Sequence, residues 1–460
     1  MNQSKGSSHP GTNLVRQLGL FDSTMILMGI VIGSGIFLTT GIMAESLPSG
    51  GLLLLAWLVG GVVTLTGALV YAELGAAMPE AGGQYIYLRE AYGPLVAFLS
   101  GWVIFLVYMC GGIALLGVAF SEYFGSFFPF FSTKTYIIST DFFSLSGGQL
   151  MAVILIILFS IANYVGVVFG KRVQNTLTVI KTAAILALII FGLLVEKGVP
   201  IDLSFDAGDM SFSQVVVGFA VAMVAVFWAF DGWNNVNFVA GEIKNPARNL
   251  PLALTLGTTL VAVLYVLVNL VYLKALPISE MSGVITIADS ASSALFGEAA
   301  TWFLTIAILI SIVGSLNGSI LVGARVYYAM AKDGLFFQKM TTIHPRFKTP
   351  SVAIVTQAVW SSFLALSGTL DQLFVYVIFS AVIFWIITVA GVFTLRKKKP
   401  DMPRPYKTWG YPVTPVIFIL ACTGILINTL FESPVESLAG LGITAVGVPV
   451  YFYWRGKQKN

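Results

Sequence analysis

Two short stretches place polar and flexible residue types inside otherwise apolar sequence. The first, "MGIVIGSGIFL" from Met28 to Leu38, holds three glycines and a serine, and the second, "FWAFDGWNNVNF" at 227–238, holds an acid, a glycine and three asparagines. Glycine and asparagine weaken a regular helix, so we expect the backbone to unwind at both places. Unwound backbone within a membrane presents N–H groups to anions and C=O groups to cations.

The chemistry expected at these breaks fits a ligand that carries both charges. Unwinding at Gly33, Ser34 and Gly35 frees N–H groups at the positive end of the following half-helix, which suits a carboxylate. Carbonyls around Val31 and Ile32, and others in the segment from Trp228 to Asp231, suit an ammonium group. Donors for a carboxylate beside acceptors for an amine describe an α-amino acid.

The elements that hold these breaks are apolar runs long enough to cross a membrane. Hydrophobic residues make up 57% and charged residues 10% of 460 residues, which leaves too little polar surface for a water-soluble globule. The runs are about 20 residues long and lack the alternation of barrel strands. We predict an all-α membrane protein with twelve transmembrane helices, at 22–44, 51–78, 94–120, 149–169, 173–195, 213–241, 251–274, 300–330, 350–368, 372–395, 412–430 and 436–454.

The two breaks open blocks of similar length, 22–195 and 213–395, each of five predicted spans. Five is odd, so the blocks face opposite ways, and paired broken helices in inverted halves are typical of secondary transporters. We therefore expect one transporter domain over 1–460, with a 5+5 inverted repeat, helices 1 and 6 unwound at the midplane, and two additional helices at 412–454. Only the block length and the two breaks support the repeat.

Lysine and arginine predict the orientation, because cytoplasmic loops carry the excess of positive charge. With the N terminus inside, 21 of the 25 basic residues lie on the cytoplasmic side, and Lys134, Lys197 and Lys274 lie outside. Both termini are then cytoplasmic, the net charge of +4 reflects topology, and no nucleic-acid partner is expected. The N-terminal tail lacks the features of a cleaved signal peptide. Cys110 and Cys422 fall inside predicted spans and favour packing over a disulfide, metal or cofactor site.

Several stretches resemble one known family. They are "GIVIGSGIF", "EAGGQYIYLREAYG", "FWAFDGWNNVNFVAGEIKNPARNLP" and "GSLNGSILVGARVYYAMAKDG". Together they resemble the L-type amino acid transporter (LAT) family of the amino acid, polyamine and organocation (APC) superfamily, from about residue 16 to 454. The resemblance implies the inverted-repeat fold and sodium-independent, obligatory exchange of neutral L-amino acids by alternating access.

The resemblance also implies roles for individual residues. Ser34, Gly35 and Ile36 match the amides that bind the substrate carboxylate, Val31 matches a carbonyl that receives the amine, and Trp228 matches an aromatic gate. Asp231 stands where some members have glycine, and either selects cationic substrates or caps the unwound backbone. Asn234 is expected to stabilise the break. The predicted substrate-binding set is Val31, Ile32, Gly33, Ser34, Gly35, Ile36, Trp228, Ala229, Phe230, Asp231 and Asn234.

Lys181, in "TVIKTAAILALIIFG", is placed well inside the fifth span. A charge at that depth costs about 2.5–3.5 kcal/mol on insertion scales, so a partner is expected. The resemblance implies that the ammonium replaces a sodium ion of sodium-coupled relatives and bridges span-one carbonyls to a hydroxyl of span eight, Ser315 first or Ser311 second. A packing or snorkelling lysine is the alternative.

Other classes of function fit the sequence less well. An enzyme is disfavoured because His9 and His344 lie outside the spans and no carboxylate pair or metal cluster lies within them. A channel would need a filter loop, and none is evident. A proton-coupled amino acid symporter stays open, with Lys181, Asp231 or Glu73 as the titrating group.

The loop at 121–148 bears on partners. Animal members of the family use a cysteine there to bond an accessory glycoprotein, and this loop contains none. We expect no disulfide-linked accessory subunit, with amino acid substrates and the lipid bilayer as the only partners. The chain then resembles a prokaryotic member in the cell inner (plasma) membrane.

Overall fold

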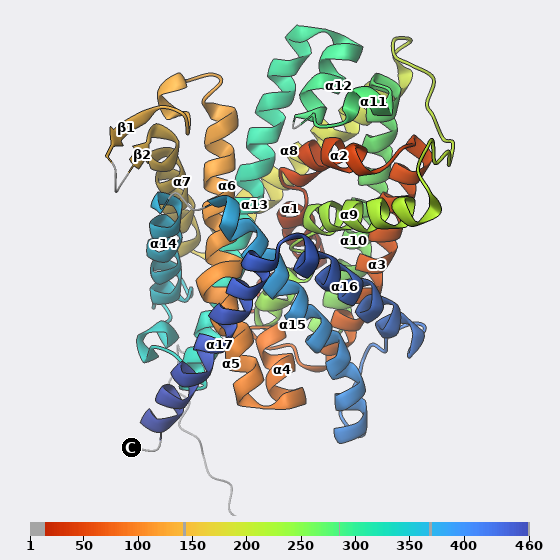
Figure 1. Cartoon of the computed structure of the whole chain (residues 1–460). Coiled ribbons are helices and arrows are strands. Elements are labelled where there is room, and N and C mark those ends of the chain that lie inside the picture. The colour runs from red at the N-terminus through yellow and green to blue at the C-terminus, as the bar shows by residue number, and fades with distance from the viewer. Residues whose placement is uncertain (1–13, 141–143, 285, 368–369, 459–460) are drawn as a thin grey trace, which may run out of the picture.

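The chain folds into a bundle of long helices (Figure 1). The computed structural model describes residues 14–140, 144–284, 286–367 and 370–458. In the first half the helices are α1 (Leu20–Val31), α2 (Gly35–Ser46), α3 (Gly50–Ala77), α4 (Gln84–Tyr92), α5 (Pro94–Val103), a π-helix (Ile104–Tyr108), α6 (Met109–Phe124), α7 (Gly147–Tyr164) and α8 (Val167–Leu194).

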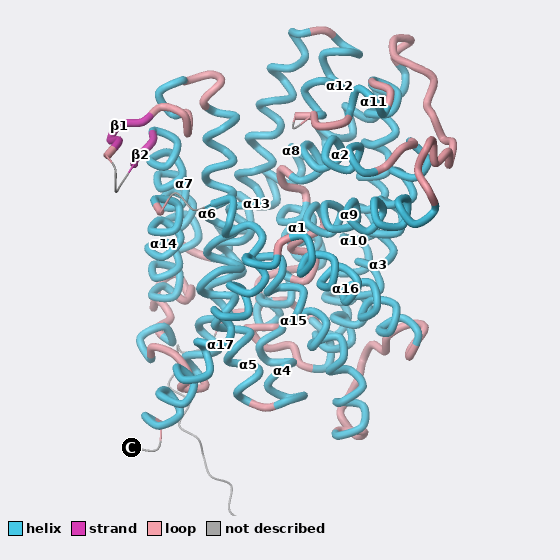
Figure 2. The backbone as a smooth tube through the Cα atoms, viewed as in Figure 1, coloured by secondary structure: helices cyan, strands magenta, loops and turns pink. Residues whose placement is uncertain are grey.

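The second half continues in the same way, with little else than helix (Figure 2). Its helices are α9 (Phe212–Ala229), a 3-10 helix (Asn235–Glu242), α10 (Pro246–Ala275), α11 (Ile278–Met281), α12 (Ile287–Phe296), α13 (Glu298–Lys332), α14 (Ser351–Leu366), α15 (Leu370–Lys398), α16 (Val413–Glu432) and α17 (Pro434–Lys457). Short 3-10 turns occur at Pro129–Phe131 and Gln338–Thr341, and an antiparallel pair of strands is formed by β1 (Tyr136–Ser139) and β2 (Ser144–Ser146).

Ten helices among the described residues are long and apolar enough to cross a membrane, or eleven if the bent pair α1 and α2 forms one span. The predicted all-α, multi-pass architecture is therefore confirmed. The apolar helix α14 is shorter, at 16 residues. Helix α8 begins at Val167, earlier than the predicted boundary at 173, and includes Lys171 and Arg172. A charged first turn does not stop a helix whose end projects beyond the membrane.

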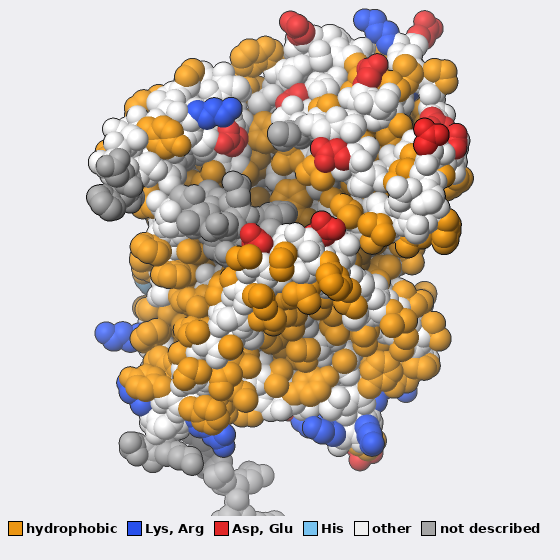
Figure 3. Space-filling model, viewed as in Figure 1, with side chains coloured by type: hydrophobic (Ala, Val, Ile, Leu, Met, Phe, Trp, Pro, Cys, Tyr) orange, Lys and Arg blue, Asp and Glu red, His pale blue; other side chains and the backbone are white. Residues whose placement is uncertain are grey.

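The surface has two charged ends separated by an apolar belt (Figure 3). Acidic side chains gather at the end near α11 and α12, which we call the acidic end. Lysines and arginines gather at the opposite end, which holds the C terminus and which we call the basic end. The last turns of α13, α15 and α17 each carry basic residues. This separation of charge follows the loop pattern in the sequence.

Two interrupted helices meet near the middle of the bundle. Helices α1 and α2 are bent by 42° across Ile32–Ser34. Helix α9 ends at Ala229, and the chain then turns through Gly232, whose φ of 92° favours glycine. A Cβ on Gly232 would lie 2.4 Å from Ile30 Cγ2, and one on Gly35 would lie 2.8 Å from Ala229 Cα. The contacts explain why glycine is required where the two helices touch.

A buried ion pair joins elements at the basic end. Backbone N–H groups of Gln17 and Leu18 donate to the Glu242 carbonyl at 2.8 and 2.9 Å. The Glu242 carboxylate accepts from Arg325 Nε at 2.6 Å and from Nη2 at 3.2 Å, and both side chains are at most 1% exposed. The charge pattern counted Arg325 among the 21 basic residues of the cytoplasmic side and predicted nothing about its burial. The structure buries it, where it links the segment after α9 to α13.

Candidate functional site

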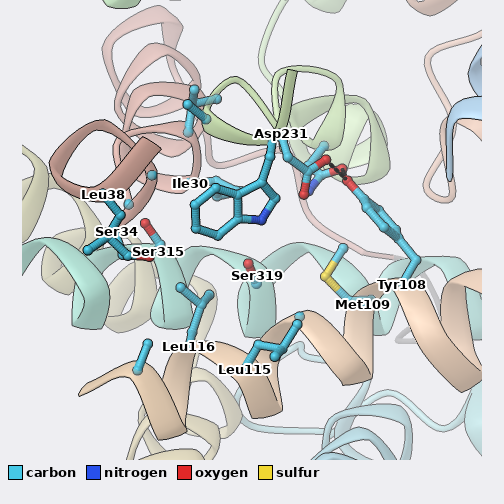
Figure 4. Close-up of a pocket in the computed structure, with 18 residues that line it drawn as sticks. Ile30, Ser34, Leu38, Tyr108, Met109, Leu115, Leu116, Asp231, Ser315 and Ser319 are labelled. Carbon is cyan, nitrogen blue, oxygen red and sulfur yellow. Dashed lines mark hydrogen bonds between the residues drawn. The ribbon is translucent and has the colours of Figure 1, made fainter. Parts of the chain in front are cut away.

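A cavity of about 190 Å³ lies where the broken helices meet (Figure 4). Its walls come from α1, α2, α6, α9 and α13, together with the turn that follows α9. Of the predicted substrate-binding residues, those that line it are Val31, Gly33, Ser34, Gly35, Trp228, Ala229 and Asp231. The structure thus brings the two unusual stretches of sequence to one cavity.

The donor side of the cavity is the first turn of α2. Ser34 is the N-cap and Gly35 the first helical residue, and both line the cavity. The N–H groups of a first turn have no partner within the helix and lie at the positive end of its dipole. Ile36 is buried behind them and does not line the cavity, although its N–H belongs to the same turn. This turn can bind an anionic group.

The acceptor side is formed by the last residues of α1 and α9. The Tyr265 hydroxyl, from α10, lies 2.9 Å from the Val31 carbonyl and 3.1 Å from the Ala229 carbonyl, and so bridges the two helices. The Gly33 N–H also donates to the Val31 carbonyl at 2.8 Å. Because the Tyr265 hydroxyl has a single hydrogen, each carbonyl keeps one lone pair for an ammonium group when that hydrogen points to Ala229. Tyr265 was not among the predicted residues, because a tyrosine within an apolar span does not reveal the direction in which it points.

Lys181 lies behind the cavity and contacts the same break from α8. Its ammonium donates to the Gly29 carbonyl at 2.7 Å, to the Ile32 carbonyl, and to the Ser311 carbonyl at 3.2 Å. The side chain is 1% exposed, and it forms no ion pair with the described residues. A Cβ on Gly314 would lie 3.1 Å from the ammonium nitrogen, so a small residue is needed there.

The serine hydroxyls of α13 share the α1 carbonyls with this lysine. Ser311 Oγ donates to the Ile32 carbonyl at 2.9 Å, and Ser315 Oγ lies 3.1 Å from both the Gly29 and Ile32 carbonyls. The sequence predicted a bond from the lysine to one of these hydroxyls. The structure places the ammonium beside them, with its α13 contact at the Ser311 carbonyl. The Ile32 carbonyl is thus occupied by these donors, and Ile32 does not line the cavity.

The remaining walls are mainly apolar. Met109, Leu115 and Leu116 line the side formed by α6, and Leu38 of α2 lies beside Ser34 (Figure 4). Phe230, which belongs to the predicted substrate-binding set, instead packs against Trp57 and Tyr265, with ring centroids 6.2 and 5.1 Å apart. It does not line the cavity.

One wall carries a polar cluster that the sequence only partly revealed. The Tyr108 hydroxyl donates to Asp231 Oδ1 at 2.9 Å and lies 3.2 Å from Asn235 Oδ1 (Figure 4). All three residues line the cavity. Asn234 does not; its side chain is buried and donates to Gln84 Oε1 at 3.2 Å. Tyr108 and Asn235 were not among the predicted residues, since nothing in the sequence distinguishes the face on which each one lies.

Glu73 lies apart from this cavity. Its carboxylate accepts from Arg396 at 2.9 and 2.6 Å and from the Thr408 hydroxyl at 2.7 Å, near the basic end. These bonds tie α3 to the end of α15 and the segment after it. Within the described ranges, no group of three His, Cys, Asp or Glu residues is placed to hold a metal ion.

Comparison with known proteins gives relatives along nearly the whole chain. The amino acid permease family matches residues 18–451. Large neutral amino acids transporter small subunit 2 from Homo sapiens is 34% identical, over 99% of this chain and 84% of that protein. The serine/threonine exchanger SteT from Bacillus subtilis is 33% identical, over 97% and 98%. The cystine/glutamate transporter from Homo sapiens is 31% identical, over 95% and 85%.

Proposed function

The chain belongs to the amino acid permease family, and from this premise we propose that it is an obligatory exchanger of neutral L-amino acids. Transport proceeds by alternating access and does not require sodium. The relatives are named as transporters and exchangers, in agreement with a transporter rather than an enzyme. The substrates, mechanism and site roles that follow are argued from the geometry of the cavity.

The observation that carries the proposal is the pairing of N–H donors and carbonyl acceptors in one small cavity. The substrate carboxylate binds the N–H groups of Ser34, Gly35 and Ile36, and its ammonium group binds the carbonyls of Val31 and Ala229. The cavity, at about 190 Å³, is smaller than the roughly 300 Å³ at which pockets for drug-sized ligands begin. Its small volume and apolar wall favour a neutral amino acid, with Trp228 as the gate.

Lys181 accounts for the absence of a sodium requirement. Carbonyls at an unwound segment need a cation or a hydrogen-bond donor when water is excluded. The fixed ammonium group supplies both to Gly29 and Ile32, in the loaded and the empty carrier alike. No mobile ion need bind to organise the site.

We also propose how the helices cross the membrane and which end faces the cytoplasm. Twelve passes result if the bent pair α1 and α2 and the short helix α14 each cross once. The two inverted repeats are 22–195 and 213–395, followed by two helices at 412–454. The positive-inside rule places the basic end, and both termini, in the cytoplasm of a cell whose inner membrane holds the protein. It works without a disulfide-linked accessory subunit.

A proton-coupled symporter is the second candidate, and one observation favours it. The Asp231 carboxylate lines the cavity and is held by Tyr108. A carboxylate that exchanges a proton beside the substrate would couple transport to a pH gradient.

Reconstituted vesicles separate the two mechanisms. The purified protein in proteoliposomes is supplied with labelled serine outside, with unlabelled serine present or absent inside, in sodium or choline, and with or without an inward proton gradient. An exchanger takes up label only into loaded vesicles, equally in sodium and choline. Uptake into empty vesicles driven by the proton gradient contradicts exchange and supports the symporter.

A further inference from the structure

A second hollow, unrelated to the cavity, runs along the membrane-facing side of α7 and α14. It is a groove of about 510 Å³, lined from Val153 to Tyr164 on α7 and from Ile354 to Leu366 on α14. From Ile354 to Leu366 the α14 side spans thirteen residues, and the twelve helical rises between them measure about 18 Å. That length is close to the thickness of one leaflet, half of a hydrocarbon core of about 30 Å. The groove therefore suits one acyl chain.

Polar groups in the groove lack partners within the described structure. Ser160 lines it, is 6% exposed, and its hydroxyl makes no hydrogen bond with the described residues. Ser362, on α14, also lines it with an unpartnered hydroxyl. Both hydroxyl oxygens are buried beneath the side chains that line the groove, so the surface that the groove presents is apolar, as an acyl chain requires. Ser160 lies one turn before Tyr164, the last residue of α7, which is a distance of about 6 Å along the helix axis.

The end of the groove at Tyr164 opens onto an aromatic and basic mouth. The Tyr164 ring lies 5.4 Å from the His344 ring, which stacks on Phe347 at 4.5 Å. Arg346 is exposed, with its guanidinium 5.5 Å from the Phe347 ring, and Lys348 follows it. Neither forms an ion pair with the described residues.

The sequence around this mouth contains no opposing charge. Neither Asp nor Glu occurs between Asp333 and Asp371, which covers α14 and the loop before it. Neither occurs between Asp141 and Glu196, which covers α7 and α8. The two cations at the mouth are thus available to an anionic group from the membrane, in contrast to Arg396 and Lys399, which pair with Glu73 and Glu90.

We propose that this groove binds an anionic phospholipid of the leaflet at the basic end. One acyl chain lies between α7 and α14, and Arg346 and Lys348 bind the phosphate. Aromatic side chains at the mouth fit the headgroup level, where tyrosine is enriched. The site is separate from the amino acid cavity and does not depend on which amino acid is carried.

A second membrane-facing groove supplies an internal comparison. It lies between α3 and α10, is about 260 Å³, and is lined by side chains such as Leu58, Val62 and Val263. Its lining residues on α10 run from Thr259 to Leu267, in the middle of that helix, and include no lysine or arginine. This groove therefore has no basic mouth. Val355 in the first groove and Val263 in the second are 50% and 51% exposed, so a tryptophan at each is a matched pair.

The test is native mass spectrometry of the purified full chain with phosphatidylglycerol and phosphatidylcholine of the same acyl chains. The wild type should retain one phosphatidylglycerol in preference to phosphatidylcholine. Arg346→Gln with Lys348→Gln should lower this preference by up to roughly 30-fold, since each cation near an anionic surface contributes a factor of about five. Val355→Trp should release the lipid, whereas Val263→Trp should retain it.

Lys244→Gln with Arg248→Gln is the charge control, because it removes two exposed cations of the same end far along the sequence from the groove. An equal loss in this control would show diffuse attraction and overturn the site. Unchanged preference in both groove variants would overturn it too. Retention of only neutral lipid by the wild type would also overturn the site. The same holds if the Val355→Trp variant keeps its lipid and changes only the number of protein chains per particle. If Val355→Trp fails to fold, the comparison of the Arg346→Gln, Lys348→Gln variant with its charge control still tests the proposal.

Discussion

Loss of the Lys181 side chain would remove a charged donor from several backbone carbonyls at once. The ammonium donates to the carbonyls of Gly29 and Ile32, on the segment that also forms the substrate cavity. The hydroxyls of Ser311 and Ser315 share these carbonyls but carry no charge. Removal of the ammonium therefore leaves the unwound segment without its fixed cation.

We expect Lys181→Ala to lower the exchange of labelled serine at least tenfold, because the α1 break loses the partner that holds its shape. The matched control is Lys274→Ala. Lys274 also donates to two carbonyls, those of Leu193 and Val195, but these lie at the C-terminal end of α8, far from the α1 break. Exchange by the Lys274 variant should stay close to that of the wild type. A fully active Lys181 variant would leave this lysine with a packing role alone.

Gly35 supports a prediction about the carboxylate site. A Cβ at this position would lie 2.8 Å from Ala229 Cα and 3.1 Å from Ala229 Cβ, so any larger residue separates the two broken helices. Gly35→Val should reduce serine binding, measured by tryptophan fluorescence or scintillation proximity, by tenfold or more. Gly112 lines the same cavity with nothing within 4 Å of a Cβ, so Gly112→Ala should bind normally.

The same measurement tests the assigned polarity of the site. An amine that lacks the carboxylate should compete poorly with serine for the wild-type protein. Competition as strong as that of the parent amino acid would show that the first turn of α2 does not bind the carboxylate.

At the scale of elements, the sequence predicted where helices would be and where two of them would weaken, but not how each helix is rotated. Apolar runs located the spans, and the glycine and serine content located the first break. Tyr108 and Tyr265 were missed because a residue inside an apolar span gives no indication of the neighbour it faces. Phe230 was assigned to the cavity because of its position beside Trp228, and the turn after α9 directs it elsewhere.

Helix α12, at the acidic end, offers a test of an element outside the spans. It packs against α2 and α13, and burial raises the pKa of its Asp289 carboxyl to about 6 from the ordinary value of 3.8. Oδ1 of this carboxylate is buried and has no hydrogen-bond partner in the described structure. A raised pKa means that the folded protein binds the proton more tightly than the unfolded chain does.

The charged form of Asp289 therefore lowers stability above pH 6, and the loss is recovered as the pH falls from about 6 toward 4. Asp289→Asn should raise the apparent melting temperature at pH 7.5 and make it less dependent on pH between 7.5 and 5. Asp209→Asn, at an exposed position in the loop before α9, should change neither. A larger gain in the Asp289 variant at pH 5 than at pH 7.5 would contradict the assignment.

At the scale of the whole molecule, membership in the family was predictable from long motifs, and the comparisons confirm it. The groove between α7 and α14 was not predictable, because it arises from the spacing of two helices that are distant in sequence. The separation of acidic and basic ends was predictable in kind, although burial of Arg325 was not. Its partner, Glu242, lies on a different segment of the chain.

The last prediction concerns orientation, which rests on charge alone. In a background with Cys110→Ser and Cys422→Ala, single cysteines replace Ser204 and Ala247, which are exposed and lie on either side of α9 and the segment after it. Both native cysteines are buried, so their replacement leaves the exposed surface of the protein almost unchanged. A membrane-impermeant maleimide added to whole cells should label Ser204→Cys, and should label Ala247→Cys only after permeabilisation, because the positive-inside rule places the basic end in the cytoplasm. Labelling of both from one side would mean that the segment between them does not cross the membrane, and reversed labelling would invert the whole bundle.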